Sequence, residues 1–209
     1  MRPFLLDYVA QCKNPDGTPF AVFTRGFYNL NIIGIRSSGR TANTFNDRIA
    51  VVYRDEYGFV CREWPATTDP GSFWLQNPMR AEGCAILIPG QYRGAYKLGK
   101  HRGQYDALIQ TGGPVRLWRD NNRDEALDMD AASVSEPTFA GINIHRATSR
   151  TDGESGGGSQ TVDRWSAGCQ VFQDPDDFSA FMDLVNKSAE LYGPRFTYTL
   201  IDDPFAAVA

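Results

Sequence analysis

RIAVVYRDEYGFVCREWPAT, residues 48–67, holds two runs of β-branched and aromatic residues on either side of a turn. Such runs favour strands, and the Asp and Gly residues between them favour a turn. Eight further short runs have a similar composition and are bounded by turn-forming residues. They cover residues 29–37, 83–90, 94–99, 106–110, 113–120, 139–147, 168–172 and 195–202. The sequence therefore predicts a mainly β domain.

Two segments are predicted to be helical. Residues 5–12 have apolar side chains at roughly helical spacing. Residues 174–193 begin with Pro175 among acidic residues, which suits a helix N-terminus, and end at Gly193 followed by a proline. Their apolar stripe consists of Phe178, Phe181, Met182 and Val185. We expect one principal helix near the end of the chain and a short one at its start.

Composition limits the class of protein. With 209 residues, of which 42% are hydrophobic, the chain is expected to fold as one globular unit. The formal charge of −4 is spread over the sequence without a basic stripe, which argues against nucleic acid as a partner. No run of about 18 apolar residues occurs, so no membrane insertion and no secretory signal are expected, and the compartment is left open. The four cysteines lack CxxC spacing, and with two histidines they make no zinc pattern. They are either paired, in an oxidising compartment, or free thiols, which the lack of a signal peptide favours.

The segment WSAGCQVF, residues 165–172, places Cys169 after a small, flexible turn and before a β-prone run. A cysteine at such a position is either a small buried hydrophobe or a nucleophile that needs a nearby base. Gly168 permits a sharp turn, after which the backbone N–H groups near Cys169 would form an oxyanion hole.

His145 is one of two histidines in the chain and stands in GINIHRA, residues 141–147. Strand alternation puts Ile142 and Ile144 on one face and Asn143 and His145 on the other, polar face. His145 is therefore the candidate base, although a strand histidine can also be purely structural.

The order of these motifs resembles the L,D-transpeptidase catalytic domain, a family of cysteine enzymes that act on peptidoglycan stem peptides. The resemblance covers roughly residues 30–202: a strand histidine, a loop, a Ser-x-Gly-Cys turn, a helix and a final strand. It implies a β-sandwich over residues 30–209 behind an extension of residues 1–29. It also implies that Cys169 is the nucleophile, His145 the base, and Ser166 and Gly168 parts of the catalytic turn. A backbone carbonyl is expected to orient His145, with Asp163 as an alternative.

The sequence departs from the family motif at Ala167, Gln170 and Val171. Arg146 and Arg164 flank the two motifs and are candidates for binding a stem-peptide carboxylate, unless they are ordinary surface residues. His101 follows the stretch PGQYRGAYKLG, which resembles a family segment that borders the substrate. It is a further substrate-binding candidate, together with Tyr96 and with Tyr92 and Tyr105.

RDNNRDEALDMD, residues 119–130, resembles a calcium loop. Asp120, Asn122, Asp124 and Asp128 fall at spacings that such loops use for their oxygen ligands. Glu125 stands where the loop needs glycine, and Ala131 stands where a closing acid belongs. The segment is either an acidic turn or a structural calcium site.

Three functions follow from these patterns. The first is cysteine-dependent acyl transfer on peptidoglycan stem peptides without a required cofactor. The second is hydrolysis by the same thiol, as in a carboxypeptidase or endopeptidase of phage or toxin-like origin. The third is a non-catalytic structural or wall-binding module in which Cys169 is merely buried. The glycine-rich residues 151–161 are expected to form a mobile loop between the two motifs.

Overall fold

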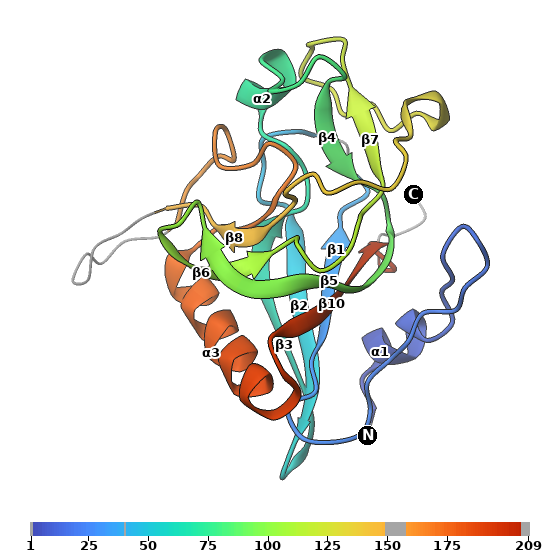
Figure 1. Ribbon diagram of the computed structural model, residues 1–209, viewed down its shortest axis with the longest axis vertical. Helices are drawn as coiled ribbons and strands as arrows, with labels where there is room; N and C mark the ends of the chain where they lie inside the picture. Colours follow the sequence, from blue (N-terminus) through green and yellow to red (C-terminus); the bar gives the residue numbers. More distant parts are fainter. Residues whose placement is uncertain (1, 40, 149–157, 206–209) are drawn as a thin grey trace.

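The computed structural model describes residues 2–39, 41–148 and 158–205, so most of the glycine-rich loop prediction lies outside the described residues. Eight strands close into a barrel in the order β1, β10, β5, β6, β8, β9, β3 and β2 (Figure 1). Their bounds are β1 Asn31–Arg36, β2 Asp47–Asp55, β3 Gly58–Thr67, β5 Gly90–His101, β6 Tyr105–Ile109, β8 Ile144–Arg146, β9 Gln170–Phe172 and β10 Arg195–Asp202.

The mainly β prediction is confirmed, and each predicted run overlaps one of the strands. The expected sandwich is replaced by a closed barrel. The β1–β10 and β8–β9 pairs are parallel, whereas the other barrel pairs are antiparallel. The parallel β1–β10 pair joins the first barrel strand to the last one and so closes the sheet. No local sequence pattern encodes a contact between strands so far apart.

A small second sheet lies at one end of the barrel (Figure 1). It pairs β4, Cys84–Leu87, with β7, Leu117–Asp120, in antiparallel register. The short helix α2, Ser72–Gln76, packs there through the buried Leu75 and was not predicted. A 3₁₀ turn, Ala131–Ser133, follows β7. This end of the molecule borders the cysteine motif, because Ala85 of β4 lies against Gly168.

The principal helix α3, Pro175–Tyr192, runs along the side of the barrel (Figure 1). Asp174 caps it by accepting a hydrogen bond from the N–H of Asp176, and Pro175 occupies its first turn. The predicted apolar stripe is buried against the barrel, where the ring of Phe181 lies 4.9 Å from that of Phe172. Because Phe172 belongs to β9, the helix fixes the strand that follows Cys169.

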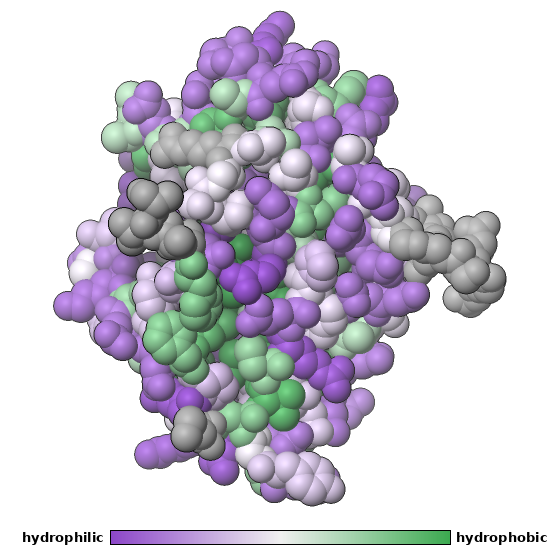
Figure 2. Space-filling view, turned by 180° about the vertical axis from the view of Figure 1, so that it is seen from behind, coloured by the Kyte–Doolittle hydropathy of each residue, from purple (hydrophilic) through white to green (hydrophobic). Residues whose placement is uncertain are grey.

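The N-terminal helix α1, Phe4–Val9, confirms the predicted short helix. Its Leu5, Leu6 and Val9 are buried against outward-facing residues of the barrel such as Ile33. Apolar side chains gather over part of the surface in the reverse view (Figure 2). Phe4 and Phe205 are exposed, with their rings 5.3 Å apart. Among the described residues no helix is long and apolar enough to cross a membrane.

Candidate active site

The parallel pair of β8 and β9 brings the histidine and cysteine motifs together. His145 is paired with Val171, and the N–H of Gln170 donates to the carbonyl of Asn143 at 2.9 Å. Since Cys169 directly precedes β9, its turn lies beside the strand that carries His145. The two motifs that the sequence singled out are therefore neighbours in space, although 24 positions separate them (169 − 145).

The residues 165–169, here called the cysteine turn, are fixed by contacts from within and from outside. The Ser166 hydroxyl donates to the carbonyl of Cys169 at 2.8 Å and accepts from the N–H of Gly168 at 3.1 Å. Gly168 has a φ of 110°, and a Cβ there would lie 2.3 Å from the carbonyl oxygen of Ala85 in β4. Ser166 is thus a brace of the turn, and Gly168 is required by both its dihedral angle and its surroundings.

The cysteine turn leaves two backbone donors available. Because the N–H of Gly168 is bonded to Ser166, it is not part of an oxyanion hole in this state. The N–H groups of Ala167 and Cys169 donate to no described residue. These two are therefore the candidate donors for a developing oxyanion.

Gln170 ties the cysteine turn to the opposite side of the barrel. Its amide oxygen accepts from the buried Tyr198 hydroxyl at 2.7 Å, and its amide nitrogen lies 3.3 Å from the carbonyl of Gly168 and 3.4 Å from that of Thr68. Gln170 is fully buried. The sequence marked it as a departure from the family motif, and the structure gives it a bracing role that its local sequence could not reveal.

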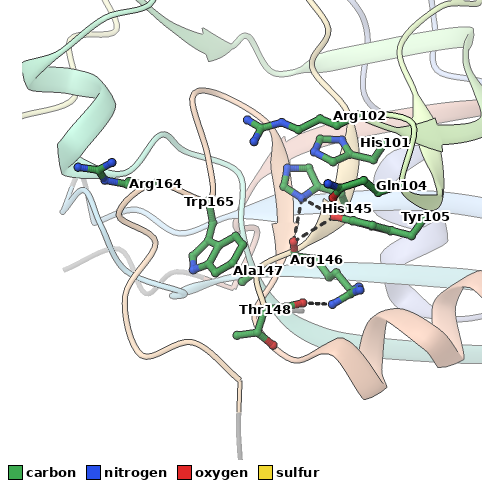
Figure 3. A pocket seen from close by; sticks show the side chains of 10 residues that line it. All are labelled: His101, Arg102, Gln104, Tyr105, His145, Arg146, Ala147, Thr148, Arg164 and Trp165. Carbon is green, nitrogen blue, oxygen red and sulfur yellow. Dashed lines mark hydrogen bonds between the residues drawn. The ribbon is translucent and has the colours of Figure 1, made fainter. Parts of the chain in front are cut away.

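The tautomer of His145 follows from its partners. Its Nδ1 lies 2.9 Å from the carbonyl oxygen of Arg146, which can only accept, so Nδ1 carries the proton (Figure 3). The Tyr105 hydroxyl lies 3.4 Å from the same nitrogen. The expectation that a backbone carbonyl orients the ring is confirmed, and Asp163 is not needed for that purpose. The free lone pair is left on Nε2, as a general base requires.

His101 stacks on His145, with the ring centroids 4.1 Å apart and an interplanar angle of 23° (Figure 3). The side-chain oxygen of Asn143 accepts from the N–H of Gln110, so its amide nitrogen donates to Nδ1 of His101 at 3.2 Å. Nε2 of His101 must then carry the proton. The stacked pair thus presents one acceptor, on His145, and one donor, on His101. The prediction that Asn143 and His145 share a face is confirmed because both meet His101.

These two histidines line a pocket together with Arg102, Gln104, Tyr105, Arg146, Ala147, Thr148, Arg164 and Trp165 (Figure 3). Trp165 is 40% exposed and belongs to the cysteine turn itself. An exposed indole beside two neutral imidazoles provides a surface for a peptide or other polar organic group.

The electrostatics of the site favour neutral groups. Burial raises the pKa of the Cys169 thiol to about 11, opposed by the N–H of Asn143 and the positive charge of Arg102. Burial, with repulsion from His101, lowers the pKa of His145 to about 3. The thiol is partly exposed and donates to the carbonyl of Gly141 at 3.5 Å. The resting site therefore holds a neutral thiol and a neutral imidazole.

The candidate substrate-binding residues have different outcomes. His101 lines the pocket, as expected of such a residue. Arg146 lies 4.5 Å over the ring of Tyr105 and donates to the carbonyl of Thr148, while Arg164 lies 3.8 Å over the ring of Phe73 and points away from His145 (Figure 3). Both arginines line the pocket, but their guanidinium groups already stack on aromatic rings.

Tyr96 does not fulfil its predicted role. Its side chain is fully buried inside the barrel, where it packs edge-on against Tyr198, so it offers no surface to a substrate. Tyr92 lies in a different depression and is bonded to the carbonyl of Ile88. Tyr105 does reach the site. Arg102, at the tip of the β5–β6 hairpin, was not among the predicted substrate-binding residues, although it belongs to a basic cluster with Lys97 and Lys100.

The residues 120–128, here called the acidic loop, are brought together by bonds among themselves. The Asn122 amide donates to Asp124 at 2.9 Å and to Asp128 at 2.7 Å, and Asp120 accepts from the N–H of Asp128 at 3.0 Å. One oxygen of the buried Asp120 has no partner in the described structure. Among the described residues no group of three or more His, Cys, Asp or Glu side chains is arranged to hold a metal ion. The calcium site stays a prediction.

No family model, curated protein or solved structure matches this chain. The function therefore has to be argued from the chemistry of the cysteine turn and the histidine pair.

Proposed function

We propose that this protein is a cysteine acyl transferase of the L,D-transpeptidase type that acts on peptidoglycan stem peptides. The observation that carries the proposal is the orientation of His145. Its Nδ1 is held by the carbonyl of Arg146, and its strand is paired with the strand that follows Cys169. An available Nε2 lone pair beside a braced cysteine turn is the arrangement that a thiol nucleophile needs.

In this mechanism Cys169 attacks the carbonyl carbon of a peptide bond and forms a thioester. His145 takes the thiol proton on Nε2 and gives it to the leaving amine. The N–H groups of Ala167 and Cys169 hold the oxyanion, and the protonated Nε2 of His101 supplies a further neutral donor in the pocket. An amine of a second peptide, or water, then breaks the thioester. The proton released by that nucleophile returns through His145 to the thiolate.

The neutral resting pair has a kinetic consequence. Because the pKa of Cys169 is raised and that of His145 is lowered, proton transfer before substrate binding is unfavourable. The sulfur then carries a negative charge only briefly. As the carbon–sulfur bond forms, that charge moves to the carbonyl oxygen, which becomes the oxyanion. Such a site avoids the oxidation and side reactions to which a standing thiolate is prone.

The test is mass spectrometry of muropeptides after incubation with the wild-type protein, Cys169→Ala and His145→Gln. Cys61→Ala serves as the matched control because Cys61 is an exposed thiol on β3, away from the pocket. We expect cross-linked products that require Cys169 and His145 and do not require Cys61. Trimmed monomers with the same dependence would assign the second step to water. Unchanged muropeptides with folded wild-type protein would refute the enzyme and leave a wall-binding module.

A further inference from the structure

A second groove begins at the cysteine turn and shares no lining residue with the His145 pocket. It is lined by Met79, Arg80, Gly83, Cys84, Ala85, Arg119, Ala140 and Ala167. Ala167 belongs to the cysteine turn, and Ala140 precedes Gly141, whose carbonyl accepts from the Cys169 thiol. A molecule bound in this groove therefore ends within a residue or two of the proposed nucleophile.

Two guanidinium groups of separate segments meet at this groove. Arg80 and Arg119 both line the groove, and consistently the pKa of Arg119 is lowered by burial and further by the positive charge of Arg80. Arg119 donates to the carbonyl of Gly83 at 3.4 Å. In the described part of the chain, neither arginine takes part in an ion pair. The carboxylate of Glu82 is near enough to raise the pKa of Arg119, and it also lines the adjoining depression. Two arginines with one nearby carboxylate leave an excess of positive charge, which a bound anion would offset.

The groove continues past the arginines. Both also line a wider depression with residues 132–138, the segment that follows the acidic loop. Its lining includes Ser133, Ser135 and Thr138, whose backbone N–H groups are bonded within the protein and whose hydroxyl oxygens remain as polar groups of the lining. The small side chains of Ala85, Ala140 and Ala167 keep the end near Cys169 open, while the arginines stand where the narrow and wide parts join. An extended chain with one anionic group fits this layout.

We propose that this groove binds a second peptide through a free carboxylate held by Arg80 and Arg119. The planar guanidinium groups suit the two oxygens of a carboxylate, and the groove leads from them to the cysteine turn. The inference rests on the proposed function in one respect, since it takes the peptide to be the partner in the reaction at Cys169. The binding itself does not depend on that reaction.

The experiment measures binding by isothermal titration to Cys169→Ala protein, which cannot turn over. The probes are the tetrapeptide L-Ala-γ-D-Glu-meso-diaminopimelyl-D-Ala and the same peptide with its carboxyl groups amidated. Arg80→Gln with Arg119→Gln is compared with Arg62→Gln, an exposed arginine on β3 at a distance from β4 and β7. We expect the double variant to lose about tenfold in affinity for the acid peptide, as for one charged bidentate contact. It should leave the weaker affinity for the amidated peptide unchanged.

Equal affinity of the double variant and Arg62→Gln for the acid peptide would overturn the proposal, as would no binding of that peptide at all. Arg80→Gln alone should shift affinity in the same direction, and it changes only an exposed side chain should the double variant fail to fold. The two proposals fail separately. Arginine-dependent binding without muropeptide turnover removes the reaction and keeps the groove, whereas turnover with arginine-independent binding removes only the groove.

Discussion

The cysteine turn and the acidic loop are both short, polar segments that the sequence marked as candidate sites, yet they are held in different ways. Distant elements fix the cysteine turn: Ala85 of β4 lies against Gly168, and Gln170 reaches Tyr198 of β10. The polar side chains of the acidic loop are bonded mainly to one another, as with Asn122, Asp124 and Asp128. Distant elements hold the loop only at its apolar Leu127 and at Ala126 and Glu125. A site that must position a nucleophile needs the first kind of support, because local bonds alone leave a loop free to rearrange.

Of the changes that test this comparison, Gly168→Ala should lower the free energy of unfolding the most. The new Cβ would meet the carbonyl oxygen of Ala85 at 2.3 Å and would strain a residue with a φ of 110°. Overpacking and backbone strain together are expected to cost about 4 kcal/mol of unfolding free energy. Gly103→Ala is the matched control, because φ is also positive there but nothing lies within 4 Å of the new Cβ. Urea unfolding of both variants measures the difference. Equal losses would mean that β4 does not hold the cysteine turn.

Acid should destabilise the region of the cysteine turn through His145. Its pKa is lowered to about 3 in the folded protein, chiefly by burial, so between the ordinary value and that one the unfolded chain binds a proton that the folded chain does not. Stability therefore falls as pH falls, by about 3 kcal/mol at pH 4 relative to a His145→Gln variant. Urea unfolding of both proteins from pH 7 to pH 4 checks this. If the unfolding free energies of the two proteins changed in parallel with pH, the pKa of His145 would be the same in the folded and the unfolded chain.

Asp120 in the acidic loop should change the stability with pH in the opposite direction, measured by the same urea unfolding experiment. Burial raises the pKa of Asp120, so the folded protein takes up that proton before the unfolded chain does as pH falls. Wild-type protein should gain stability relative to Asp120→Asn on acidification. The two regions are thereby distinguished by the direction of their pH dependence alone.

Gln170→Met should have an intermediate effect. The substitution keeps a similar volume but leaves the buried Tyr198 hydroxyl and the carbonyl of Gly168 without the amide. An unsatisfied buried donor is expected to cost about 2 kcal/mol. Adding Tyr198→Phe should recover part of that loss, because it removes the orphaned hydroxyl. A double variant with fully additive losses would argue that the two side chains are not coupled.

Calcium should have the smallest effect. If Asp120, Asn122, Asp124 and Asp128 bind calcium, a concentration about five times the Kd adds about 1 kcal/mol, or about 3 °C in Tm. Asp120→Asn should abolish that shift, since Asp120 contributes the buried oxygen that lacks a partner. Magnesium at the same concentration is the control. A Tm that responds to neither calcium nor a chelator would leave the segment as an acidic turn.

The sequence by itself determined the strands and the principal helix, and it indicated a sharp turn at Gly168. β-Branched runs, turn residues and a helical apolar stripe act over a few neighbouring positions, which is why each predicted run overlaps a strand and the stripe of α3 is buried. The predicted face of His145 was correct for the same reason. Alternation along one strand is a local property and needs no knowledge of the partner strand.

Only the tertiary structure decided how the strands close and which side chains meet at the site. The parallel pairing of β8 with β9 sets His145 beside the cysteine turn, and the β5–β6 hairpin brings His101 onto it. Tyr96 was placed wrongly because nothing local said that it faces into the barrel. Arg80 and Arg119 likewise meet only through folding. Pairing between distant segments depends on burying a common core and closing one barrel, and those are properties of the whole chain.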